Sequence, residues 1–189
     1  MSTVYLSRAE LGEIHGIAPG SAKKYEDDGR LPPADVVIGG GLLRGKVPGL
    51  ETRTPRPGAR RRLYYGYRPE TALAWQRPGR GARTDLADDH PPRSSPVRHL
   101  SVTEFGEIHG YPEEYAKKAF AAGIFPEPDI IVGGGLLRGH VEGLPKHSND
   151  DRRELARYGY RIDTALRWQR PGQGARTDLH RDGPGRRRR

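Results

Sequence analysis

The amino-acid sequence contains one segment twice, and this duplication restricts the fold more than any other feature of the chain. LSRAELGEIHG, at residues 6–16, returns as LSVTEFGEIHG at residues 100–110, an offset of 94 residues. The match continues through IGGGLLRG and VGGGLLRG. After a one-residue deletion it resumes with YGYRPETALAWQRPGRGARTDL and YGYRIDTALRWQRPGQGARTDL. Because a repeated segment is usually one structural unit, the sequence predicts two copies of one small fold.

On this basis the chain divides into four parts. The first copy spans residues 1–86 and the second spans residues 98–179. Between them, residues 87–97 (ADDHPPRSSPV) are polar and proline-rich, which is typical of a linker. Residues 180–189 form a basic tail with little apolar surface to bury, and we expect this tail to be disordered.

Charge is the second constraint. Lys and Arg number 33 against 24 Asp and Glu, which gives a net charge of +9 and an isoelectric point near 10.0. The first copy has 15 basic and 9 acidic residues, the second has 12 of each, and the tail contributes +4. Such an excess favours a polyanionic partner. Its distribution predicts that the first copy and the tail make most of the contacts with phosphates.

The composition also bears on location. Cysteine is absent, which removes disulfides and thiolate chemistry. The first thirty residues lack the apolar core of a signal peptide, and no apolar run approaches the roughly 20 residues of a membrane-spanning helix. We therefore expect a cytoplasmic, nucleoid-associated protein.

Local signals predict two short helices at the start of each copy. Ser7, followed three residues later by Glu10, forms a capping box that opens a helix, and Gly16 ends it. A second helix is expected from Pro19 to about Asp28. Two short helices joined by a glycine turn are typical of a helix-turn-helix.

The rest of each copy predicts a hairpin and a closing helix. Residues 35–38 are rich in β-branched side chains and predict a strand, with its return strand near residues 63–67. The glycine- and arginine-rich stretch between them, residues 39–62, has the character of an extended wing. Residues 71–76 are expected to form a short helix that anchors the core through Trp75.

In this order the elements resemble the MerR-like winged helix-turn-helix superfamily. The shared features are Leu-Ser-x-x-Glu-Leu, a glycine turn, a second helix that begins with proline and carries Lys23, then Gly-x-Leu-Pro-Pro and a later Gly-Tyr-Arg. The closing Trp-Gln-Arg-Pro-Gly-Arg-Gly-Ala-Arg-Thr-Asp is similar to the smaller AlpA and excisionase branch. The wing is longer than the family's, and the coiled-coil dimerisation helix of full-length MerR regulators is missing. The resemblance implies a mainly α fold with small β wings (α+β), arranged as two tandem winged helix-turn-helix domains.

The candidate DNA contacts lie in three segments. The exposed face of the second helix is placed to meet a major groove. The arginine-rich wing can follow the backbone or enter a minor groove, and the RPGRGAR segment resembles chains that enter narrow minor grooves. Each segment also has a plain structural alternative, as a solvated helix face, a solvated loop or a helix terminator. The candidate residues are Ser21, Lys23, Lys24, Arg53, Arg56, Arg60, Arg61, Arg62, Arg77, Arg80, Arg83, Lys117, Lys118, Arg170 and Arg176.

Other motifs are incomplete. GGLLRGK at residues 40–46 approaches a phosphate-binding loop, but Val47 occupies the position where a Ser or Thr must hold magnesium. His15 and His109 lie at matching helix ends, and neither has a second ligand nearby in the sequence. We therefore expect no catalytic residues, no metal and no cofactor, and predict that the protein is not an enzyme.

These observations together predict sequence-selective binding to double-stranded DNA, by a transcription regulator or an excisionase-like architectural factor of phage or plasmid type. Two alternatives stay open. The neutral second copy can bind a partner protein or self-associate while the first copy holds DNA, or the ligand can be RNA, which the scarcity of exposed aromatic residues disfavours. Two copies joined head to tail predict direct-repeat half-sites about 10 bp apart.

Overall fold

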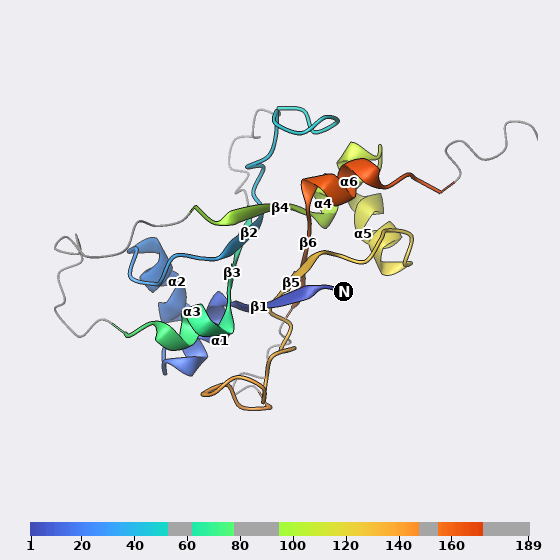
Figure 1. Ribbon diagram of the computed structural model, residues 1–189. Coiled ribbons are helices and arrows are strands. Elements are labelled where there is room, and N and C mark those ends of the chain that lie inside the picture. Colours follow the sequence, from blue (N-terminus) through green and yellow to red (C-terminus); the bar gives the residue numbers. More distant parts are fainter. Residues whose placement is uncertain (53–61, 78–94, 148–154, 172–189) are drawn as a thin grey trace, which may run out of the picture.

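A computed structural model describes residues 1–52, 62–77, 95–147 and 155–171. Within them, six strands form a closed barrel in the order β1-β3-β2-β4-β6-β5, flanked by two groups of short helices (Figure 1). The first repeat supplies β1 (Thr3–Ser7), α1 (Arg8–Ile14), α2 (Pro19–Asp27), β2 (Val36–Gly39), β3 (Leu63–Tyr67) and α3 (Pro69–Ala74). The second supplies β4 (Val97–Ser101), α4 (Val102–Ile108), α5 (Glu113–Ala121), β5 (Ile130–Val132), β6 (Arg157–Tyr160) and α6 (Ile162–Arg167).

The predicted fold class, a mainly α fold of two tandem winged helix-turn-helix domains, is wrong. Both repeats contribute strands to one barrel instead of forming two separate winged units. β1 pairs in parallel with β5, and β2 pairs in parallel with β4, so that Thr3 lies opposite Ile130 and Val36 opposite Val97. The physical reason is that an isolated wing leaves the hydrogen-bonding groups at its strand edges unpaired. Here the other repeat pairs them.

The individual elements are nevertheless close to those predicted. The Ser7 hydroxyl accepts from the Glu10 backbone N–H at 3.3 Å, and a Glu10 carboxylate oxygen accepts from the Ser7 N–H at 2.6 Å, so the predicted capping box is confirmed. The second helix begins at Pro19 and β3 covers residues 63–67, as expected. The closing helix α3 begins two residues earlier than predicted. Short-range signals thus locate the elements without fixing their assembly.

The two repeats are related by a two-fold axis that runs along the barrel. Exchanging each strand for its equivalent moves it three places round the barrel and keeps its direction, because β1, β2, β4 and β5 run one way and β3 and β6 the other. Only a half-turn about the barrel axis does this. Accordingly, α1–α3 lie on one side of the barrel and α4–α6 on the other (Figure 1).

Apolar side chains fill most of the barrel interior. They come from β1, β2 and β5 and form one buried cluster: Tyr5, Val36, Ile38, Ile130 and Val132. Gly66 lies where the inner wall leaves no room for a side chain, since a Cβ there would be 2.6 Å from Val36 Cγ2 and 2.8 Å from Val132 Cγ2. Its equivalent, Gly159, is crowded in the same way by Ile130. The sequence Tyr-Gly-Tyr in β3 and β6 is therefore a packing requirement of the barrel.

One polar side chain enters this core. His99 occupies the position in β4 that Tyr5 occupies in β1, and it is 5% exposed. Its Nδ1 lies 3.3 Å from the Val97 carbonyl oxygen. Burial lowers the pKa of His99, against smaller opposing effects of the Val97 carbonyl and Asp129. The folded barrel therefore favours the neutral imidazole.

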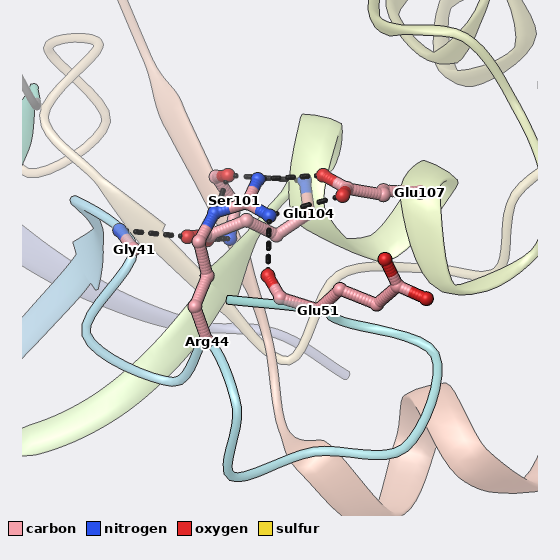
Figure 2. A network of polar contacts seen from close by, with 6 residues as sticks. All are labelled: Gly41, Arg44, Glu51, Ser101, Glu104 and Glu107. Atoms are coloured by element: carbon pink, nitrogen blue, oxygen red, sulfur yellow. Dashed lines mark hydrogen bonds and ion pairs between the residues drawn. The ribbon is translucent and has the colours of Figure 1, made fainter. Parts of the chain in front are cut away.

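The glycine-rich segment after β2 crosses to the other repeat (Figure 2). The Gly41 N–H donates to Glu104 Oε1 at 2.9 Å, and the two Nη atoms of Arg44 donate to the two carboxylate oxygens of Glu107 at 2.9 and 2.6 Å. Glu104 also completes the capping box of α4 with Ser101. Three apolar side chains of the same segment are buried in the core of the second repeat: Leu43, Val47 and Leu50.

The segment after β5 makes the reciprocal contacts with the first repeat. The Gly135 N–H donates to Glu10 Oε1 at 3.1 Å, and Arg138 donates to both carboxylate oxygens of Glu13 at 3.1 and 2.6 Å. Leu144 is buried with residues of α1 and β1 in the first repeat's core. We call these two sets of contacts the clasps. Each helical group is thus completed by the other repeat.

The clasps change the interpretation of the predicted wing. Residues 40–52 fold against the second repeat and are not an extended wing, while residues 53–61 lie outside the described part of the chain. None of the described helices has the length and apolar character needed to cross a bilayer.

Splitting the chain tests the shared barrel. When residues 1–90 and 91–189 are produced separately, each half should associate with itself or precipitate, because β1 and β2, or β4 and β5, lack their partner strands. Mixed halves should form a 1:1 complex that unfolds in one cooperative transition, as measured by analytical ultracentrifugation and thermal melting. Halves that are monomeric and fold cooperatively alone would contradict the shared barrel.

His99 should make stability depend on pH. Since its folded pKa is lowered, the unfolded chain takes up a proton first as the pH falls below about 6.5, and stability should decline by at most ~1.4 kcal/mol per pH unit from this group. His99→Tyr, which installs the residue of the first repeat, should make the loss of stability between pH 7 and pH 5 less steep. Urea unfolding of both proteins across this range measures the effect. Equal slopes would mean that His99 does not titrate differently on folding.

Candidate nucleic-acid interface

Helix α2 is held so that its predicted contact residues face solvent. Ala22 is fully buried and packs against α1 at Gly12, where a Cβ would lie only 3.0 Å from the Ala22 Cβ. This close approach turns the opposite side of the helix outward, and Ser21, Lys23 and Lys24 are all exposed. In α5, Ala116 makes the same contact with Gly106, and Lys117 and Lys118 are exposed. The structure thus places both predicted helix faces at the surface.

These two faces carry little net charge. On α2, Lys23 Nζ lies 2.7 Å from Asp27 Oδ2, with both side chains 58% exposed, and Asp28 follows at the helix end. On α5, Lys117 Nζ lies 3.8 Å from Glu113 Oε1, and Glu114 is exposed beside it. Acidic neighbours therefore balance the lysines on both helices. Neither helix alone is a strong electrostatic site for phosphates.

The arginine that follows each tryptophan is held by an aromatic ring. Arg77 Nε donates to the Tyr25 hydroxyl at 3.3 Å, and the guanidinium carbons of Arg30 and Arg77 lie 4.2 and 5.7 Å from the Tyr25 ring centroid. In the second repeat, the Arg170 guanidinium lies 4.2 Å from the ring centroid of Tyr111. Arg77 is therefore held beside a tyrosine of α2, and Arg170 beside a tyrosine shortly before α5.

The sequence analysis did not predict that these two tyrosines contact the arginines. Its helical periodicity assigns Tyr25 to the inward face, whereas the structure leaves the ring half-buried under two guanidinium groups. The hydrogen bond from Arg77 lowers the pKa of Tyr25, and the positive charges of Arg30 and Arg77 act in the same direction. A tyrosine on a helix, in a chain with this many arginines, was a signal that could have predicted a cation–π contact.

The other predicted contacts divide between described and undescribed parts. Arg62 is exposed directly before β3. The remaining predicted arginines lie outside the described residues: Arg53, Arg56, Arg60, Arg61, Arg80, Arg83 and Arg176.

The positive charge of the chain is concentrated outside the described fold. The described residues contain 18 Lys and Arg against 16 Asp and Glu, a net charge of +2. The remaining residues contain 15 against 8, a net charge of +7. Residues 53–61 hold four arginines and no acidic residue, and residues 172–189 hold six arginines against two aspartates. The equivalent of the first segment in the second repeat, residues 148–154, has a net charge of −1.

The two helix-end histidines have structural partners. His15 Nε2 lies 2.8 Å from the Ala72 carbonyl oxygen, and the ring meets Trp75 edge-on at 4.7 Å. His109 repeats the arrangement with Ala165 and Trp168. In the part of the chain that the structure describes, no three His, Cys, Asp or Glu side chains come together as a metal site. The glycine-rich motif belongs to the clasps.

No protein-family model, curated protein or solved structure matches the chain. The resemblance to the MerR-like superfamily therefore stays a prediction from the sequence. The local order of helices and hairpin strands that suggested it is present, but the shared barrel is not the fold that it implied.

Removing Arg77 should change the titration of Tyr25. Arg77→Ala deletes the hydrogen bond to the phenol, so the pKa of Tyr25 should rise toward its ordinary value. The measurement is NMR of ring-labelled tyrosine, with the Tyr25 signal assigned from Tyr25→Phe. Arg62→Ala removes another exposed arginine and should leave the pKa unchanged. An unchanged Tyr25 titration in Arg77→Ala would show that Arg77 is not held at Tyr25.

Proposed function

We propose that this protein binds double-stranded DNA, with the nearly neutral barrel as a scaffold and two arginine-rich segments as the main source of attraction. The observation that carries the proposal is the division of charge, +2 within the described fold and +7 outside it. Charge needed only for solubility has no reason to gather in two short segments. Closely spaced arginines release counterions when they meet phosphates, and this release supplies much of the affinity of DNA-binding proteins.

The first segment is attached to the fold at both ends. Residues 53–61 connect Thr52, in the segment after β2, to Arg62, which directly precedes β3. Both Thr52 and Arg62 are exposed. The second segment, residues 172–189, follows α6. Segments joined to a rigid body at fixed points have less freedom to lose on binding than free peptides of the same composition. In this proposal, the exposed residues of α2 and α5 add polar contacts to a duplex already held by the arginines.

The symmetry of the fold changes the expected DNA site. Direct repeats were expected from two domains joined head to tail, but the repeats are related by a two-fold axis along the barrel. A single duplex in contact with both α2 and α5 would therefore meet them in opposite orientations. Any sequence selectivity that involves both helices should favour inverted half-sites.

Exchanging one segment between repeats tests the proposal. Replacing residues 53–61 with SNDDRRE, the sequence of residues 148–154, removes four arginines from the first segment and brings in two with three acidic residues. Because each arginine paired with a phosphate contributes about 0.9 to the slope of log K against log salt, the net loss of two arginines should make the slope less steep by at least about 2. The three acidic residues beside the new arginines should add to this effect. Fluorescence anisotropy with a labelled duplex at several salt concentrations measures this slope.

Two controls sharpen the test. Arg152→Ala with Arg153→Ala changes the equivalent segment of the second repeat and should have a much smaller effect on the slope. Binding to duplex DNA, single-stranded DNA and RNA at one salt concentration separates the proposed partner from the alternatives. Duplex binding that is insensitive to salt, or equally strong in the exchanged variant, would contradict the proposal, as would a clear preference for RNA.

A further inference from the structure

The end of the barrel where four strands begin opens into a cavity of about 560 Å³. Both repeats line it in matched positions, with Asp35 and Arg68 from the first and Asp129 and Arg161 from the second. The two-fold axis of the barrel passes through this end, so the cavity faces equivalent groups across the axis. The mouths of β-barrels are common sites for small molecules. We call this cavity the barrel mouth.

The two aspartates of the barrel mouth serve the fold. The Arg68 N–H donates to Asp35 Oδ2 at 2.8 Å, and the Arg161 N–H donates to Asp129 Oδ2 at 2.8 Å, which holds the backbone directly before α3 and α6. The Thr164 hydroxyl also donates to Asp129, at 2.9 Å. These carboxylates already accept hydrogen bonds from backbone groups, and they are not the groups that a ligand would need to satisfy.

The two arginine side chains lie at the rim of the barrel mouth. Their side chains are 63% and 64% exposed, and each makes an ion-pair contact through Nε. Arg68 Nε lies 3.9 Å from Asp35 Oδ1, and Arg161 Nε lies 3.1 Å from Asp163 Oδ1. The Nη groups are the part of a guanidinium that binds carboxylate or phosphate oxygens in pairs. The rim is therefore suited to an oxyanion.

The floor of the barrel mouth has a different chemistry. It is formed by Tyr5 and His99, which are 7% and 5% exposed, together with apolar side chains such as Val36 and Ile130. When Nδ1 of His99 donates to the Val97 carbonyl oxygen, Nε2 carries a lone pair, and this atom has no partner among the described residues. An imidazole nitrogen with a free lone pair at a cavity wall is a hydrogen-bond acceptor for a ligand hydroxyl.

We propose that the barrel mouth binds a small hydroxylated organic anion, whose oxyanion pairs with Arg68 and Arg161 and whose hydroxyl donates to His99 Nε2. A hydroxycarboxylate and a phosphorylated polyol share this chemistry. The site does not include the proposed DNA contacts of residues 53–61, since β3, which follows them in the sequence, begins at the opposite end of the barrel. The proposal therefore does not rest on DNA binding.

Isothermal titration calorimetry of the full chain tests the site with four probes. Malate supplies a carboxylate and a hydroxyl, and glycerol 3-phosphate supplies a phosphate and a hydroxyl. Succinate lacks the hydroxyl of malate, and glycerol lacks the oxyanion. We expect malate or glycerol 3-phosphate to bind at least tenfold more tightly than its matched control, and the stronger of the two identifies the natural oxyanion.

Variants place the binding at the barrel mouth. Arg68→Ala with Arg161→Ala should weaken binding at least tenfold without unfolding the barrel, because the hydrogen bonds to Asp35 and Asp129 use backbone N–H groups and the truncated side chains are exposed. Arg62→Ala removes an exposed arginine that does not line the cavity, and this variant should bind as the unaltered protein does. His99→Phe, which keeps an aromatic ring but has no hydrogen-bond acceptor, should remove the preference for malate over succinate while the protein still melts cooperatively.

Three results would overturn the proposal. One is undetectable binding of both malate and glycerol 3-phosphate at millimolar concentration. Another is binding that survives in the double arginine variant, which would place the anion on the arginine-rich segments. The third is equal affinity for malate and succinate, which would remove the role of His99.

Discussion

Pairing between strands of different repeats is the constraint on which the rest of this structure depends. β1 and β2 of the first repeat each have one antiparallel neighbour, β3, and one open edge, and the second repeat has the same pattern. Backbone N–H and C=O groups left unpaired away from water are costly. Closing the two half-barrels on each other pairs both open edges and buries the β-branched inner faces at once.

The clasps extend this exchange to the helices. The core around Phe105 includes Leu43, Val47 and Leu50 from the other repeat, and it would lose a large part of its apolar contacts without them. The Arg44–Glu107 pair is 17% exposed on each side, and Arg138 is 7% exposed in its pair with Glu13. Two partly buried, bidentate ion pairs are geometrically specific, so they fix where each segment docks more than they add stability.

Much of the secondary structure was predictable because its causes are local. Ser7 and Glu10 define a helix start by themselves, and Pro19 does the same for α2. The barrel was not predictable in this way, because parallel pairing of β1 with β5 joins residues more than 120 positions apart. A signal for it was present. The segment after β2 is too apolar for a solvated wing, because it contains Leu43, Val47 and Leu50. In addition, both repeats contain the same two glutamates, Glu10 and Glu13 or Glu104 and Glu107, and the same arginine, Arg44 or Arg138.

The candidate interface was predicted less completely. Exposure of the lysines on α2 and α5 followed from helical periodicity, but the cancellation of their charge by Asp27 and Glu113 depends on side-chain pairing.

The repeats have also diverged in ways that only the packing explains. Arg8 and Glu26 form an ion pair in the first repeat, where the second has Val102 and Phe120, whose ring packs against Tyr158. An ion pair in the first repeat and an aromatic contact in the second therefore occupy equivalent positions.

The clasps also bear on how such a gene can change. Arg44 is paired with Glu107, which lies 63 positions further along the chain, and Arg138 is paired with Glu13, 125 positions away. A substitution of one of these arginines therefore removes an ion pair from a helix of the other repeat. The two halves of the gene are not free to drift as independent modules, and viable changes at these positions should arise as pairs drawn one from each half.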